Sequence, residues 1–99
     1  LVQVYFGHIA DSNLHLIATR DGIDAALKHQ VEDVVYAHVA RFGGSISAEH
    51  GVGRLKRPYL ALSRSAPELA LMQTLKSALD PAGILNRGRI LEPLPRAAE

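Results

Sequence analysis

Two short apolar runs separated by a polar cluster open the chain. Residues 1–7 and 14–19 are rich in β-branched, aromatic and aliphatic side chains, a composition typical of β-strands. Residues 10–13, which lie between them, are small or polar and favour a turn. The pattern therefore predicts two strands joined as a hairpin or as a tight corner.

A longer segment follows in which apolar side chains recur at steps of three and four residues. Its stripe consists of Leu27, Val31, Val34, Val35, His38 and Phe42. This spacing predicts an amphipathic helix of about five turns. Asp21 is placed to cap the start of this helix, with Asp24 three positions later, and Gly43 and Gly44 are placed to end it.

The second half of the chain alternates a glycine-rich loop with helical patterns. Residues 45–53 predict a loop with at most one strand-like stretch, and residues 54–62 a short helical segment interrupted by Pro58. Ser65 and Glu68 have the spacing of a capping box at the start of a second amphipathic helix. Its apolar stripe consists of Leu69, Met72, Leu75 and Leu79, and it should end at Asp80 because a residue before proline resists the helix.

These elements predict an α+β fold in which two main helices lie on one face of a small, mostly antiparallel sheet. The 99 residues suffice for one small domain at most. We expect residues 1–92 to be folded and residues 93–99 to form a flexible tail. Because the chain opens directly on a strand-like run, we also expect it to be a piece of a longer protein.

Composition excludes several classes of function. Eleven basic and ten acidic side chains leave a net charge of +1, which excludes nucleic-acid binding by bulk charge. The absence of cysteine excludes disulfides, thiolate metal sites and a cysteine nucleophile. No apolar run approaches the length of a membrane span, whereas an apolar content of 47% is sufficient for a core.

The first candidate site contains two histidines. His8 and His15 lie seven positions apart, across a turn that also carries Asp11 and Asn13. A hairpin can bring two such imidazoles within reach of one metal ion, for which neutral imidazole is the commonest ligand. Two histidines alone are a weak signal, and partly buried, hydrogen-bonded side chains are the commoner case, so the spacing leaves both interpretations open.

The second candidate site is an acid–histidine pair surrounded by four glycines. Glu49 and His50 could supply one carboxylate ligand and one base, or could be solvated side chains of a surface turn. For the remaining candidate residues, a structural or surface role is the stronger interpretation. Asn86 is then a turn residue, and His29 and His38 have packing or surface roles. The basic side chains of Arg54, Lys56 and Arg57 lie on a solvated surface rather than around an anion.

Three segments in a fixed order make a pattern more specific than any one of them. Residues 7–16 are close to Gly-His-x-Gly-Asp-Gly-Asn-Leu-His, residues 44–53 match Gly-x-x-Ser-x-Glu-His-Gly-x-Gly, and residues 79–86 match Leu-Asp-Pro-x-x-x-Leu-Asn. Together they resemble the C-terminal domain of FAD-linked oxidases of the vanillyl-alcohol-oxidase superfamily. That family includes D-lactate dehydrogenases, glycolate oxidase flavoprotein subunits and D-2-hydroxyglutarate dehydrogenases.

The resemblance implies a domain architecture and a set of site residues. It makes the chain the last part of an α+β substrate or cap domain that follows an FAD-binding domain, so that the fragment alone should be inactive. FAD would be bound mainly by that other domain. By position, His50 is implied to be the general base and Asn13 and Asn86 to lie near the isoalloxazine ring. A divalent metal, usually taken as zinc, would be held by His8, His15 and Glu49.

The resemblance also implies a reaction and partners. A D-2-hydroxy acid would be oxidised to the 2-oxo acid, its hydroxyl proton passing to His50. The electron acceptor would be an electron-transfer flavoprotein, a cytochrome or a quinone. We expect a cytoplasmic location, and self-association as a homodimer wherever the surface that meets the flavin domain is left exposed.

The chain departs from the family pattern at several positions. Ala10 and Ser12 stand where the family often has glycine, and Arg87 and Arg89 stand for a proline and a lysine. Ile17 stands where the 2-hydroxyglutarate branch has an asparagine that contacts substrate, which leaves lactate, glycolate or another acid open. Two other functions also remain open: a zinc-dependent hydrolase using the same ligands, and a non-catalytic α+β interaction module. The motif at residues 79–86 favours the flavin enzyme over the hydrolase, which has no reason to need it.

Overall fold

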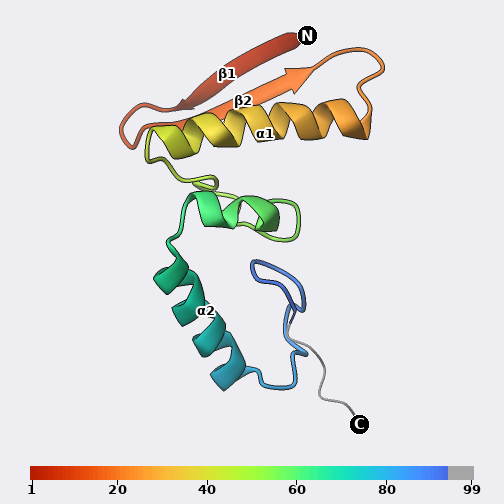
Figure 1. Cartoon of the computed structure of the whole chain (residues 1–99). Coiled ribbons are helices and arrows are strands. Elements are labelled where there is room, and N and C mark those ends of the chain that lie inside the picture. Colours follow the sequence, from red (N-terminus) through yellow and green to blue (C-terminus); the bar gives the residue numbers. More distant parts are fainter. Residues whose placement is uncertain (94–99) are drawn as a thin grey trace. The chain divides into compact units, whose positions relative to one another are not determined.

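The computed structural model describes residues 1–93 (Figure 1). Two strands, β1 (Val2–His8) and β2 (Asn13–Thr19), precede helix α1 (Ala25–Arg41), the 3-10 helix η1 (Arg57–Leu62) and helix α2 (Ala66–Leu79). The chain divides between His38 and Val39 into two compact units. A two-stranded antiparallel sheet accompanied by helices confirms the α+β class. The predicted tail, residues 93–99, lies almost entirely outside the described residues.

Strands β1 and β2 form the predicted hairpin. Their register pairs Val2 with Thr19 and runs to His8, which pairs with Asn13. In the turn, the Asp11 carboxylate accepts a hydrogen bond of 3.1 Å from the Asn13 backbone N–H. This Asx-type bond explains why a polar cluster reverses the chain here.

One turn residue has a backbone conformation that disfavours its own side chain. Ser12, which stands where the related motif has glycine, has a φ of 60°, in the left-handed region. A side chain in that region destabilises the backbone by about 1–2 kcal/mol relative to glycine. The sequence difference noted above therefore falls at the one turn position where glycine is conformationally favoured.

We expect Ser12→Gly to stabilise the hairpin unit by about 0.5–1 kcal/mol, since the relief of strain exceeds the added entropy of the unfolded chain. Urea unfolding followed by circular dichroism measures this change. Ala10→Gly is the matched control, because Ala10 has no positive φ, and it should be neutral or destabilising. Equal or lower stability of the Ser12 variant would show that the turn carries no such strain.

Helix α1 begins later than a cap at Asp21 would place it, and it ends at the glycines, as predicted. The Asp24 carboxylate accepts a hydrogen bond of 2.7 Å from the Leu27 N–H, so Asp24 caps the helix and the prediction of Asp21 is wrong. Gly43, with a φ of 67°, donates its N–H to the carbonyl of Ala40, which confirms the predicted end.

In the first unit, the hairpin and α1 leave a cleft between them. Figure 1 shows β2 running beside α1, and Leu16, Ala18, Val31 and Val35 line a cleft of about 210 Å³ between the two elements. Val34, from the predicted stripe, is exposed, and every residue of β1 is exposed as well. The unit is thus held by its strand ladder more than by a filled core.

The second unit has a small core around η1. Ile46, Tyr59 and Leu60 are buried. Pro58 occupies the first turn of η1, so it begins that helix, and the prediction that it interrupts one is wrong. Among the described residues, no helix has the length and apolar character needed to cross a membrane.

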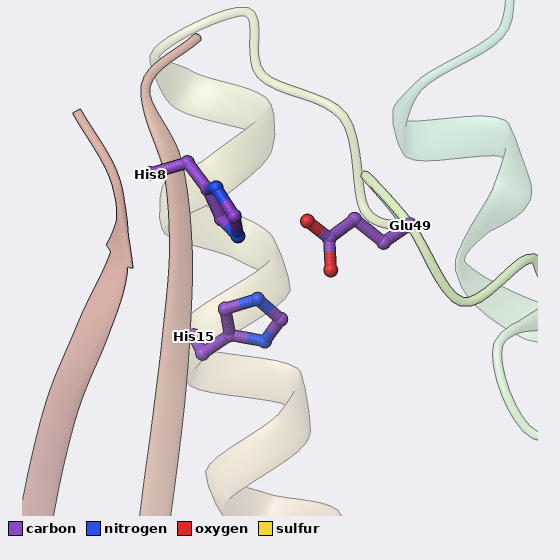
Figure 2. A group of neighbouring side chains, drawn as sticks. All are labelled: His8, His15 and Glu49. Carbon is purple, nitrogen blue, oxygen red and sulfur yellow. The ribbon is translucent and has the colours of Figure 1, made fainter. Parts of the chain in front are cut away.

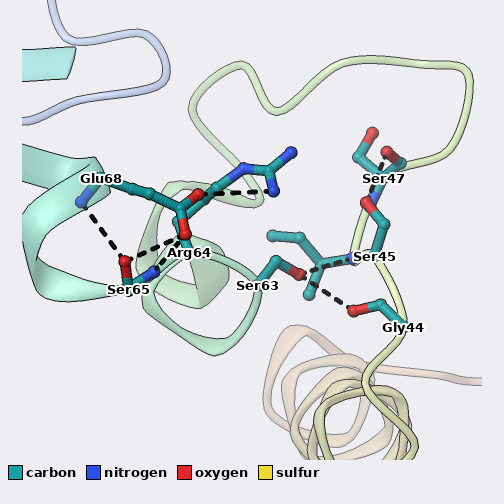
Figure 3. A network of polar contacts seen from close by, with 8 residues as sticks. Gly44, Ser45, Ser47, Ser63, Arg64, Ser65 and Glu68 are labelled. Atoms are coloured by element: carbon teal, nitrogen blue, oxygen red, sulfur yellow. Dashed lines mark hydrogen bonds and ion pairs between the residues drawn. The ribbon is translucent and has the colours of Figure 1, made fainter. Parts of the chain in front are cut away.

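Helix α2 confirms the capping prediction. The Ser65 side chain accepts from the backbone N–H of Glu68, and the Glu68 carboxylate accepts from the Ser65 N–H, as the capping box requires (Figure 3). The helix ends at Leu79, and Asp80 follows as its C-terminal cap.

Candidate functional site

The two candidate histidines share one face of the hairpin. His15 is opposite Phe6 and His8 is opposite Asn13, so His8 and His15 are diagonal neighbours across the two strands. Residues two apart on a strand point to the same side, and diagonal neighbours are within reach of long side chains. Figure 2 shows both imidazoles projecting to the same side of the hairpin. This placement fits a metal ion held by two neutral imidazoles.

An aromatic side chain fixes the orientation of one of these imidazoles. The rings of Phe6 and His15 are stacked, with centroids 4.8 Å apart and planes inclined by 9°. The contact restricts rotation of the His15 ring, as supporting residues of a metal site do. Phe6 was missed from the sequence because its pairing with His15 depends on the register of the hairpin.

The loop that carries Glu49 and His50 is braced by serine hydroxyls (Figure 3). Ser47 Oγ donates a hydrogen bond of 2.8 Å to the carbonyl of Gly51 and thereby spans Glu49 and His50. Ser45 Oγ donates to the carbonyl of Ser47, at 3.0 Å. Ser63 Oγ accepts from the Ile46 N–H, at 2.9 Å, which ties the loop to the end of η1. The segment is therefore a braced loop, as the sequence predicted, without a strand.

Within that loop, Glu49 and His50 lie side by side. His50 Nε2 is 3.9 Å from Glu49 Oε2, and both side chains are exposed. A base has to be accessible to its substrate, and His50 meets this condition. The carboxylate of Glu49 is, like imidazole, a type of ligand that zinc accepts.

The third motif, residues 79–86, contains a nearly buried carboxylate, that of Asp80, which the sequence pattern marked only as the end of a helix. Asp80 is 5% exposed, and its carboxylate accepts from the backbone N–H groups of Ile84 and Leu85, at 3.1 and 3.0 Å. Lys76 Nζ also donates to it. The hydrogen bond from Lys76 is the main reason why the pKa of Asp80 is lowered, from 3.8 to about 2. Asn86 follows directly, with a φ of 44°.

The remaining basic and histidine candidates have structural surroundings. Arg57 pairs with Glu92 at 3.0 Å and donates to the carbonyl of Gly88, and Lys56 Nζ lies 3.4 Å from Ser47 Oγ. These contacts agree with the surface interpretation of the cluster rather than with an anion site.

His29 and His38 also lie apart from the candidate chemistry. His29 is close to Glu32 and Asp33 on the exposed side of α1. The His38 ring contacts the carbonyl of Val34 one turn earlier, at 2.8 Å, and is exposed. His38 is therefore not part of an apolar stripe, although its surface role agrees with the prediction.

Comparison with known proteins decides the family. Residues 1–90 match the family described as FAD linked oxidases, C-terminal domain. The chain belongs to this family. A D-2-hydroxyglutarate dehydrogenase from Xanthomonas citri pv. viticola is 46% identical over 94 residues, covering 90% of the chain and 20% of the relative.

Further relatives carry two different names. A mitochondrial D-2-hydroxyglutarate dehydrogenase from Danio rerio is 46% identical over 83 residues, covering 84% of the chain and 16% of the relative. A D-lactate dehydrogenase from Anaerostipes hadrus is 43% identical over 89 residues, covering 86% of the chain and 19% of the relative. The chain thus spans about a fifth or less of the length of these relatives.

Membership of the FAD-linked oxidase C-terminal domain family confirms the resemblance on which the residue assignments were based. All three motifs lie inside the matched range of residues 1–90. In the structure, the first two motifs are the tip of a hairpin and a braced loop, and the third is the turn after α2. Each motif places its chemistry-bearing side chains where the backbone is held by specific hydrogen bonds.

Proposed function

We propose that this chain is part of an FAD-dependent dehydrogenase that oxidises a D-2-hydroxy acid to the 2-oxo acid. The observation that carries the proposal is the match to an FAD-linked oxidase domain over residues 1–90, together with relatives named D-2-hydroxyglutarate and D-lactate dehydrogenases. Because the chain spans only a fifth of those relatives, an FAD-binding domain of the same polypeptide would hold most of the flavin. FAD, when bound, supplies the acceptor for the α-hydrogen of the substrate as hydride.

The proposed metal ligands are His8, His15 and Glu49. In support, the two imidazoles share one hairpin face, and the stack with Phe6 restrains the ring of His15. A divalent metal such as zinc would supply a Lewis acid that polarises the substrate hydroxyl. Two imidazoles and one carboxylate leave coordination positions open for the substrate.

His50 is the proposed general base. It is exposed, it is carried by a braced loop, and it lies beside the carboxylate of Glu49. Histidine changes charge near neutral pH, so it can accept the hydroxyl proton of the substrate and later release it. Asn86 and Asn13 are the proposed contacts to the isoalloxazine ring, which their amide groups would hold by hydrogen bonds.

The experiment that tests the function uses the full-length protein that contains this chain. We expect it to be yellow, to release FAD on denaturation, and to reduce a redox dye when a D-2-hydroxy acid is added. A colourless protein would overturn the proposal. So would a flavoprotein that fails to reduce the dye with every D-2-hydroxy acid tested. A zinc-dependent hydrolase would give the first result, a non-catalytic module would reduce no dye with any D-2-hydroxy acid, and the family match favours neither.

Substrate choice is proposed to depend on Ile17. Ile17 is exposed and lies two positions beyond His15, on the same hairpin face and opposite Val4. An apolar side chain there offers no hydrogen bond to a distal carboxylate. The substrate is therefore proposed to be a small or apolar acid of the lactate or glycolate type.

We expect Ile17→Asn to raise the ratio of kcat/KM for 2-hydroxyglutarate to that for lactate about tenfold, because one added hydrogen bond to a charged group stabilises by about 1.5 kcal/mol. Steady-state dye reduction with both acids measures this ratio. Thr19→Asn is the matched control, since Thr19 lies on the same face of β2 but two residues farther along the strand from His15 than Ile17 does. An unchanged ratio in the Ile17 variant would show that this position does not contact substrate.

The electron acceptor, the homodimer and the location remain predictions. The acceptor is proposed to be an electron-transfer flavoprotein, a cytochrome or a quinone. Some relatives, such as the one from Danio rerio, are named mitochondrial, so a mitochondrial location is proposed beside the cytoplasmic one.

A further inference from the structure

The turn after α2 is held by the side chains of Lys76 and Asp80, to which the proposed function assigns no role. Helix α2 is already capped by the backbone, since the Asp80 N–H donates to the carbonyl of Lys76. The Asp80 carboxylate is turned instead toward the segment that follows, where it accepts from the N–H groups of Ile84 and Leu85. The side chain therefore organises the next segment of the chain rather than the helix.

Lys76 completes this arrangement. Its Nζ donates to the Asp80 carboxylate and also, at 2.6 Å, to the carbonyl of Leu85. Both backbone groups of Leu85 are thus held by one ion pair, of which the acid is 5% exposed and the ammonium half-buried. We call Lys76 and Asp80 together the turn clamp.

The clamp sits immediately before Asn86. Leu85 is the residue whose carbonyl and N–H are both fixed, and Asn86, with a φ of 44°, is the next residue. Gly83, buried and with a φ of 63°, completes the reversal, and a Cβ at Gly83 would lie 2.8 Å from Arg87 Nη1. Asparagine adopts this left-handed conformation more readily than other non-glycine residues. The clamp fixes the backbone of the residue directly before it.

We propose that Lys76 and Asp80 are positioning residues that hold the Asn86 amide in place for the flavin. This inference rests on the proposed function, in which Asn86 contacts the isoalloxazine ring. Loss of the Asp80 carboxylate leaves the N–H groups of Ile84 and Leu85 without their acceptor, and loss of either clamp residue loosens the backbone before Asn86. The amide of Asn86 is then no longer carried by a held backbone, while the helix before it remains intact.

The test is a double-mutant cycle in the full-length flavoprotein. Lys76→Met removes the ammonium but keeps a long apolar stem, and Asn86→Ala removes the amide that the clamp positions. We expect Lys76→Met alone to lower kcat about tenfold and to shift the absorption spectrum of bound FAD. In the Asn86→Ala background, the same substitution should change neither quantity further. Asp80→Asn, which keeps the shape of the side chain, should behave as Lys76→Met does.

A matched control separates positioning from loss of stability. Ser65→Ala breaks the capping box at the other end of α2, and it should lower the melting temperature while leaving kcat and the flavin spectrum unchanged. Hydrogen exchange at Ile84 and Leu85, measured in the same proteins, should accelerate in Lys76→Met and not in Ser65→Ala.

Three results would overturn the inference. An equal fall of kcat in the presence and absence of the Asn86 amide would show that the clamp does not act through Asn86. A fall of kcat in Ser65→Ala as large as in Lys76→Met would show that general destabilisation is the cause. Unchanged exchange at Ile84 and Leu85 would show that the clamp does not hold the turn. A wild-type protein without FAD would instead overturn the proposed function, and the exchange result would still report on the clamp itself.

Discussion

His50→Gln is expected to lower kcat by about 10³-fold, with FAD and metal still bound. Proton transfer by a positioned base contributes about 10²–10⁴-fold to catalysis, and a glutamine amide cannot accept the proton. The loop should keep its shape, because its bracing bonds come from Ser45, Ser47 and Ser63 rather than from His50. Rapid mixing with a D-2-hydroxy acid, followed at the flavin absorption band, measures the step directly.

A control for this prediction is His29→Gln. His29 is also an exposed histidine beside carboxylates, those of Glu32 and Asp33. It belongs to helix α1 and not to the loop that carries His50. Its replacement should leave kcat unchanged. Turnover of the His50 variant within a factor of two of the unaltered protein would refute the assignment of the base and leave the substrate proton to another group.

His8→Ala is expected to weaken metal binding by more than about 100-fold, since even residues that only support a metal ligand contribute 10–100-fold. Elemental analysis of the full-length protein should find about one metal ion per chain before the substitution and almost none after it. Turnover should fall with the metal and should not return when zinc is restored at micromolar concentration. The flavin content should be unchanged, because His8 is not one of the proposed flavin contacts.

His38→Ala serves as the control for metal content. The His38 ring contacts the carbonyl of Val34 on its own helix, so this variant loses a histidine without touching the hairpin. It should keep its metal. Active full-length enzyme that contains no metal would confine His8 and His15 to direct contacts with substrate or to packing.

Elements that depend on neighbouring residues were predicted well from the sequence. The Asp11–Asn13 turn, the glycine stop after α1 and the Ser65–Glu68 capping box all involve partners within four positions. The errors are local choices between similar residues. Asp21 and Asp24 are both competent caps, and the structure uses Asp24 because its carboxylate meets the Leu27 N–H.

The candidate site was predictable only in part. His8, His15, Glu49 and His50 could be named because their types and spacing match a motif, but their chemistry needs partners that spacing alone does not reveal. The stack of Phe6 on His15 depends on which residues face each other across the hairpin. The Lys76–Asp80 clamp depends on a lysine one helical turn before a helix stop, a pattern common to many exposed helices.

Strand β1 pairs only with β2 among the described residues, and all seven of its residues are exposed. Its outer backbone N–H and C=O groups therefore form an open edge, flanked by the exposed side chains of Val2, Val4, Tyr5 and Phe6. Open apolar edges recruit other strands and promote aggregation. In the isolated 99 residues this edge would therefore favour association between copies of the chain, unless another strand or chain covers it.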